Sequence, residues 1–124
     1  MVESIFAELG ATAGEDVLVR VHYDGNHHYE TSGVLVAHSD PKKEAEAAAW
    51  LRQNLKPGDS LARVASACLT AWQALMDDKP FADLAMPKEP LLQLDGKMVE
   101  AALLDRKVAG PVRYRPLQLE KLKI

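Results

Sequence analysis

The clearest pattern in the chain is a run of apolar residues at helical spacing in Ser60–Met76. Apolar side chains recur there three and four residues apart, which places them on one face of a helix. Asp59 or Ser60 can cap the first turn, and Pro80 cannot continue the helix because proline has no backbone N–H. We predict that this helix packs its apolar face on a flat apolar surface. The residues of that face are Leu61, Val64, Ala65, Cys68, Leu69, Trp72, Leu75 and Met76.

A second helix is predicted over Pro41–Leu55. Pro41 follows the polar pair Ser39-Asp40, and proline fits the first helical position, where a backbone N–H would have no partner. Small alanines on one face indicate close approach to a neighbour, expected to be a sheet. This face carries Ala45, Ala48, Ala49 and Leu55, with Trp50 and Leu51 beside it.

Short segments rich in valine predict β-strands before the helices. Val17–Tyr23 ends at Asp24-Gly25, a turn in which glycine supplies the positive φ that such turns require. The chain then returns through His27–Thr31 and continues as strand over Gly33–His38, so Val17–His38 is predicted to form a hairpin. Glu3–Leu9 fits either a further strand or a helical turn.

Further strands are predicted after the helices, at Met98–Leu104 and Val112–Arg115. The connection Asp77–Lys97 contains three prolines, which argue against a regular element there. This order predicts an α+β fold for a single domain of residues 1–124, in which two helices cover one mostly antiparallel sheet.

The strand segments are nearly continuous apolar runs, as Val17–Val21, Val34–Ala37 and Ala101–Leu104 show. A sheet with one face in water alternates apolar and polar residues, so these strands are predicted to be buried on both faces. Two helices cover only one face. The other face is therefore expected to meet a layer that this chain does not contain.

Composition narrows the classes of function. No apolar run reaches the roughly 18 residues of a membrane span, and an acidic N-terminus differs from a secretory signal. The single cysteine, Cys68, excludes an internal disulfide and favours a reducing, cytoplasmic setting. On the apolar helix face, it is expected to be a buried structural thiol and not a nucleophile.

The net charge of −3 is unevenly distributed. Residues 1–104 carry 16 acids and 9 bases, whereas residues 105–124 carry two acids and six bases. Arg113-Tyr114-Arg115 alternates like an edge strand that charged side chains protect from pairing. We therefore expect neither nucleic acid nor a membrane as a partner.

Six short motifs form an ordered set along the chain. They are FAELG at Phe6–Gly10, LVRVHYDG at Leu18–Gly25, the strand Gly33–Ala37, Ser60-Leu61 with the alanine-rich helix after it, VEAALLDR at Val99–Arg106, and Arg113-Tyr114-Arg115. In this order they resemble the C-terminal half of a bacterial proteasome α-type subunit, the actinobacterial kind most of all. The chain departs from that family at Ala37-His38-Ser39, where Gly-Gly is usual, and in the Asp77–Lys97 connection.

The resemblance implies one half of the four-layer αββα sandwich of the N-terminal-nucleophile (Ntn) hydrolases. The family's N-terminal half, with the first sheet and two helices, is absent, which would explain strands without a cover on one face. Proteasome α-type subunits are non-catalytic. The resemblance therefore implies a structural or assembly component of protein degradation that acts through oligomerisation. Its partners would be itself, a chain that supplies the missing half, or proteasome-like subunits.

No catalytic, cofactor-binding or metal-binding residues are predicted. Catalytic relatives use an N-terminal threonine as nucleophile, whereas this chain begins Met1-Val2. Processing before Thr12 would expose one, but a loop follows it. An enzyme is therefore not expected.

The four histidines, His22, His27, His28 and His38, are interpreted as solvent-exposed and not as metal ligands. His27 and His28 are adjacent, so on a strand they face opposite sides, although His22 and His28 could approach across the hairpin. Asp24 is explained by its turn, and Trp50 and Trp72 by core packing.

One alternative to the assembly protein is an independent small α/β binding module with an unknown ligand. It would cover its free sheet face by homodimerisation or with the Asp77–Lys97 connection. An enzyme with an N-terminal nucleophile is a third interpretation.

Overall fold

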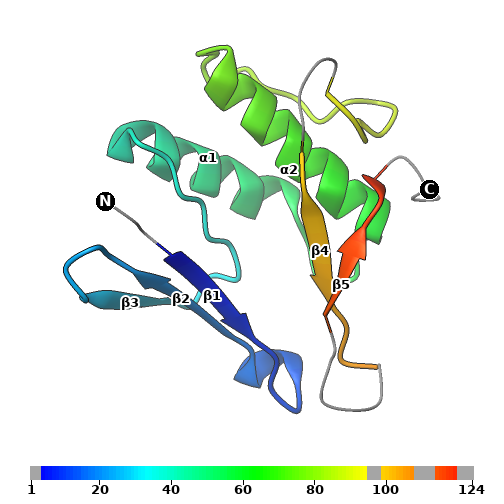
Figure 1. The fold of residues 1–124 in the computed structure, drawn as a ribbon. Helices are drawn as coiled ribbons and strands as arrows, with labels where there is room; N and C mark the ends of the chain where they lie inside the picture. The colour runs from blue at the N-terminus through cyan, green and yellow to red at the C-terminus, as the bar shows by residue number, and fades with distance from the viewer. Residues whose placement is uncertain (1–3, 95–98, 108–113, 120–124) are drawn as a thin grey trace. The chain divides into compact units, whose positions relative to one another are not determined.

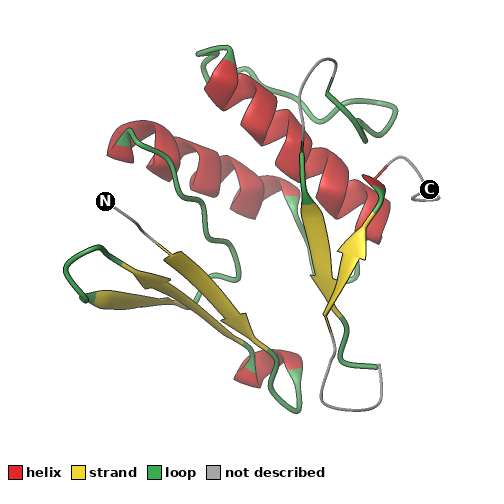
Figure 2. Cartoon of the chain, in the orientation of Figure 1, coloured by secondary structure: helices red, strands yellow, loops and turns green. Residues whose placement is uncertain are grey.

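The fold is α+β, as predicted, with two helices and two small sheets (Figures 1 and 2). The structure is a computed structural model, and it describes residues 4–94, 99–107 and 114–119. The chain divides into two compact units. We call Met1–Leu35 with Leu103–Arg115 the sheet unit, and Val36–Ala102 with Pro116–Ile124 the helix unit. The single domain of residues 1–124 stays a prediction.

The sheet unit contains a three-stranded antiparallel sheet in the order β1-β2-β3. Its strands are β1 (Ser4–Glu8), β2 (Val17–Val21) and β3 (His27–Glu30), with a 3-10 turn, Ala13–Glu15, between β1 and β2. The predicted hairpin turn is confirmed, because Gly25 has a φ of 87° and His22 N donates to Asn26 O at 2.7 Å. The N-terminal segment is a strand.

The predicted return of the hairpin through His27–Thr31 is confirmed as β3, but the predicted strand Gly33–His38 is wrong. The returning strand ends at Glu30, and Gly33–His38 contains no strand, because the chain turns away at Ser32 and Gly33. Gly33 has a φ of 80°, and Val34 N donates to Ser32 Oγ at 3.4 Å. Both features bend the backbone before a longer ladder can form.

The prediction of a single sheet is also wrong for the described residues. The last two strands, β4 (Ala101–Leu104) and β5 (Tyr114–Leu117), pair with each other in a separate two-stranded sheet. Met98, Val112 and Arg113, which belong to the predicted strands, lie outside the described residues.

The two helices of the helix unit are α1 (Pro41–Asn54) and α2 (Leu61–Met76), close to their predicted bounds. Both have the predicted side-chain caps. Asp40 accepts a hydrogen bond from Lys42 N at 3.0 Å, and Ser60 Oγ accepts one from Arg63 N at 3.1 Å. Each cap gives a partner to an N–H of the first turn that has none within the helix.

The hydrophobic core lies between α1 and α2, which pack side by side in the helix unit (Figure 1). The connection after α2 also contributes. Trp50 is buried, and its Nε1 donates to Leu84 O at 2.8 Å, while Leu91 N donates to Ser66 Oγ at 2.8 Å. The buried hydrophobic residues are Ala47, Ala48, Trp50, Leu51, Ala62, Ala67, Leu69, Ala71, Ala74 and Leu119.

The buried face of α2 differs from the predicted one. Cys68, Trp72 and Met76 are exposed, although the apolar pattern placed them in the core. The buried side chains are mostly small, which lets neighbouring backbones approach closely. Thr70 Oγ1 donates to Ser66 O at 2.7 Å, so both residues can be buried with a hydrogen bond made. The buried residues of α2 are Ala62, Ser66, Ala67, Leu69, Thr70, Ala71 and Ala74.

The buried face of α1 is also shifted from the predicted one. Ala48, Trp50 and Leu51 are buried as expected, but Ala45 and Ala49 are exposed and Ala47 is buried instead. The prediction that both helices cover the sheet relates the two units to each other, and it stays a prediction. Neither helix of the described chain is long and apolar enough to cross a membrane.

The two tryptophans provide a matched test of this core. Trp50→Phe removes the donor to Leu84 O, and we expect it to lower the free energy of unfolding by about 1–2 kcal/mol. Trp72 is 37% exposed, so Trp72→Phe should change it by less than about 0.5 kcal/mol. Urea denaturation followed by circular dichroism measures both. Equal losses of unfolding free energy in the two variants would show that Trp50 contributes no more to this core than Trp72.

Candidate functional site

One face of the β1-β2-β3 sheet displays exposed aromatic and aliphatic side chains. Phe6, Val19 and Tyr29 lie opposite one another across the three strands, because Phe6 pairs with Val19 and Val19 pairs with Tyr29. Phe6 is 56% exposed and Tyr29 is 60% exposed. We call this surface the Phe6 face. Its aromatic and aliphatic residues, with His27, are Phe6, Val17, Val19, Val21 and Tyr29, and the register also places Ser4 and Glu8 on this face.

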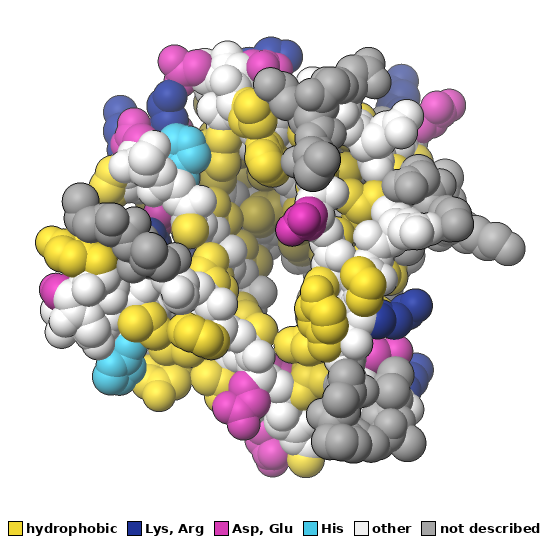
Figure 3. Space-filling view, viewed as in Figure 1, with side chains coloured by type: hydrophobic (Ala, Val, Ile, Leu, Met, Phe, Trp, Pro, Cys, Tyr) yellow, Lys and Arg dark blue, Asp and Glu magenta, His cyan; other side chains and the backbone are white. Residues whose placement is uncertain are grey.

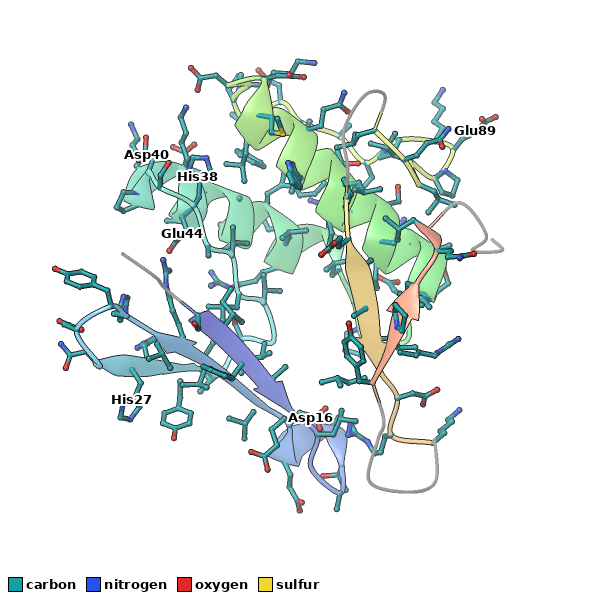
Figure 4. The ribbon with its side chains drawn as sticks, in the orientation of Figure 1. Asp16, His27, His38, Asp40, Glu44 and Glu89 are labelled. Carbon is teal, nitrogen blue, oxygen red and sulfur yellow. The ribbon has the colours of Figure 1, made fainter. Side chains whose placement is uncertain are left out.

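The strand register creates this face. Side chains alternate along a strand, so every second residue of each strand points to the same side. Val17, Val19 and Val21 therefore line the central strand of the Phe6 face, and all three are half-buried. At one end, the His27 and Tyr29 rings make an edge-to-face contact, with ring centres 5.5 Å apart. Figure 4 shows His27 projecting from β3.

The opposite face of the sheet is more mixed in character. It carries Ile5 and Leu18 beside Arg20, His28 and Glu30. Ile5 is 45% exposed. No strand residue in the described part of the chain is fully buried, so the prediction of strands buried on both faces is wrong for this chain by itself.

On the Phe6 face, the exposed Phe6 and Tyr29 flank the half-buried Val19, so apolar side chains run across all three strands. Figure 3 shows hydrophobic side chains at the surface over the β1-β2-β3 sheet. Single exposed apolar residues need no explanation, but a contiguous patch with polar residues around it is typical of an interaction surface. The patch can bury apolar surface area against a partner.

A cavity of about 560 Å³ in the sheet unit is a second candidate site. Its lining combines the apolar residues Leu9, Leu18 and Leu104 with Glu8, Asp16 and Glu30. Asp16 is already paired, because both of its carboxylate oxygens accept from Arg106 at 2.6 Å. Gly10 N donates to the same carboxylate at 2.9 Å, so this acid ties the loop before β2 to the turn after β4.

The four histidines lie in different environments. His27 and His28 are exposed on opposite faces, as predicted. His28 lies directly opposite Arg20, and His22 lies opposite Asn26, so the two histidines are not directly opposite each other. His22 is half-buried, which corrects its interpretation as solvent-exposed. Within the described residues, no group of three or more His, Cys, Asp or Glu side chains could hold a metal ion.

The role of His38 was not foreseen from the sequence. His38 is half-buried before α1, where its Nδ1 accepts a hydrogen bond from Asp40 N at 3.0 Å. Its backbone N–H donates to Glu44 Oε2 at 2.9 Å. Figure 4 shows the three residues together at the start of the helix. His38 therefore stabilises the start of α1. In the sequence, the polar residues around Pro41 indicated a capped helix start, from which this role could have been inferred.

The other candidate residues have structural environments. Asp24 Oδ1 accepts from Asn26 N at 3.0 Å and stabilises the hairpin turn, as predicted. Thr12 lies in a loop, where its carbonyl accepts from Glu15 N at 3.0 Å. Cys68 is exposed and not buried as expected, but partial desolvation still raises the pKa of its thiol. A raised pKa lowers the thiolate fraction and therefore the reactivity.

No known protein family, curated protein or solved structure matches this chain. The resemblance to a proteasome α-type subunit stays a prediction.

The environment of Cys68 gives a direct chemical test. Because its pKa is raised, we expect iodoacetamide to alkylate the folded protein at neutral pH several-fold more slowly than a free cysteine. Unfolding in urea should remove the difference. Mass spectrometry of the alkylated chain follows the rate. Alkylation of the folded protein faster than free cysteine would indicate an activated thiol instead.

Proposed function

We propose that this protein is a non-catalytic assembly component that acts through oligomerisation. The observation that carries the proposal is the Phe6 face, an exposed apolar sheet surface on the β1-β2-β3 sheet. Burial of apolar area is the dominant favourable term in most protein association. Full burial of one Phe side chain contributes about 1.5–3 kcal/mol, so a partner that covers Phe6 and its neighbours gains substantially.

The finer form of the proposal follows the resemblance to proteasome α-type subunits. The sheet and the two helices would be half of an Ntn-hydrolase-like sandwich, and the partner layer would come from a second copy or from a chain that carries the other half. The protein would work in the cytoplasm, in protein degradation. Exposed apolar residues on the sheet support this form, because a half-sandwich would have such a surface.

The cavity in the sheet unit favours a second candidate, a small α/β binding module with an unknown ligand. One version of that candidate closes the free sheet face with the Asp77–Lys97 connection. The described contacts of that connection argue against this version. Leu84 O accepts from Trp50, and Leu91 N donates to Ser66, so the connection packs on the two helices.

The native mass tests the proposal. Light scattering coupled to size exclusion should give a mass of at least a dimer for the purified chain. Phe6→Ser removes the central aromatic ring of β1, and we expect it to raise the dissociation constant about tenfold or more. Tyr114→Ser is the matched control, because Tyr114 is 59% exposed but lies on β5, in the other sheet.

A monodisperse monomer at high concentration would overturn the proposal. Equal effects of Phe6→Ser and Tyr114→Ser would show that association does not use the Phe6 face.

A further inference from the structure

Strand β3 forms an open edge of the three-stranded sheet. In the described part of the chain, it pairs with β2 only (Figure 1). Edge strands carry unpaired N–H and C=O groups, and native proteins commonly block them with lysine, proline or a bulge. His27–Glu30 contains neither lysine nor proline, and its register with β2 is regular. The edge is therefore suitable for pairing with another strand.

The hairpin turn shows which backbone groups point outward. His22 N donates to Asn26 O, so these two residues form a hydrogen-bonded pair. Hydrogen-bonded and non-hydrogen-bonded pairs alternate along an antiparallel ladder. His28 and Glu30 consequently bond to β2. The N–H and C=O groups of His27 and Tyr29 point to the open edge.

The sequence of β3 is complementary to itself in one antiparallel register. When two copies pair about Tyr29, each His28 lies opposite Glu30 of the second copy. Tyr29 then lies opposite itself and exchanges both of its outward backbone hydrogen bonds. An imidazole N–H can donate to a carboxylate, and a protonated imidazole carries the opposite charge. Because the pair has two-fold symmetry, the contact between His28 and Glu30 occurs twice.

Other registers lack this complementarity. Pairing about His28 would place two His28 side chains opposite each other. Pairing of β1 about Phe6 would place Glu8 opposite Ser4, which adds no ionic pair. Glu30 is already partnered, and its Oε1 accepts from Ser32 N at 3.1 Å, but a carboxylate has several acceptor positions and can take a further donor.

We propose that the partner is a second copy of this chain, paired through β3 in the register centred on Tyr29. The two three-stranded sheets then become one continuous sheet, and the two Phe6 faces lie on the same side of it. This pairing depends on the self-association given as the proposed function, and it specifies the partner, the strand and the register.

Disulfide trapping tests the register. In a Cys68→Ala background, Tyr29→Cys places two thiols at the centre of the proposed pair, where Cα atoms are about 5.5 Å apart. This separation suits a disulfide. His28→Cys is the matched control, because its two copies are offset along the strands. We expect mild oxidation to cross-link Tyr29→Cys at least fivefold faster than His28→Cys. Faster cross-linking of His28→Cys, or none in either, would overturn the register.

A charge exchange tests the same contact without cysteine. His28→Glu places like charges opposite each other twice, and Glu30→Lys replaces both acceptors of His28 with cations, so we expect each to raise the dimer dissociation constant about tenfold. The double variant should restore it to within about threefold of the parent. Gln53→Glu is the control, because Gln53 is exposed on α1, outside both β3 and the Phe6 face. Sedimentation velocity measures the constants, and circular dichroism confirms that each variant folds.

The outcomes separate this inference from the proposed function. Weakening by Phe6→Ser without rescue in the double variant would leave association through the Phe6 face and overturn the β3 pair. Rescue with no effect of Phe6→Ser would support the β3 pair and overturn the role of the Phe6 face. A monomeric parent chain would overturn both.

Discussion

The close packing of α1 against α2 uses small side chains, and it contains nearly all of the fully buried hydrophobic residues in the described chain. Leu119 is the exception outside these helices. Alanine side chains bring two backbones together but bury little apolar area each, so the core depends heavily on Trp50, Leu51 and Leu69. The strands, by contrast, contain valine, phenylalanine and tyrosine and are nowhere fully buried. The larger apolar side chains on the sheet are therefore the ones that a partner could stabilise.

This distribution of apolar surface connects the fold to the proposed assembly role. A three-stranded sheet gains stability from a covered apolar face, and an open edge gains hydrogen bonds from another strand. The β1-β2-β3 sheet offers both an exposed face and an open edge at β3. Pairing through β3 would not cover the Phe6 face but would double its area. The two features are therefore compatible in one assembly.

The sequence predicted the features that depend on local chemistry. The caps at Asp40 and Ser60 and the turn at Asp24-Gly25 involve residues close in sequence, so their signals are direct. The buried face of α2 was predicted less well. Apolar periodicity emphasises large side chains such as Trp72 and Met76, whereas the observed packing selects small ones on a neighbouring face.

Features that depend on distant parts of the chain were harder to predict. The separate pairing of β4 with β5 cannot be read from the composition of either strand. The candidate surface was anticipated only in outline. The continuous apolar runs in the strands indicated that one face of the sheet would contact a further layer. The alignment of Phe6, Val19 and Tyr29 could be recognised only from the strand register.

Hydrogen–deuterium exchange as a function of protein concentration identifies the backbone amides that an assembly protects. Association through the sheet predicts that exchange slows with concentration in β1, β2 and β3, most strongly at the outward amides of His27 and Tyr29. Amides of α1 and α2 should exchange at the same rate throughout. Exchange of the sheet amides that is independent of concentration, or protection confined to the helices, would show that this protein does not associate through the β1-β2-β3 sheet.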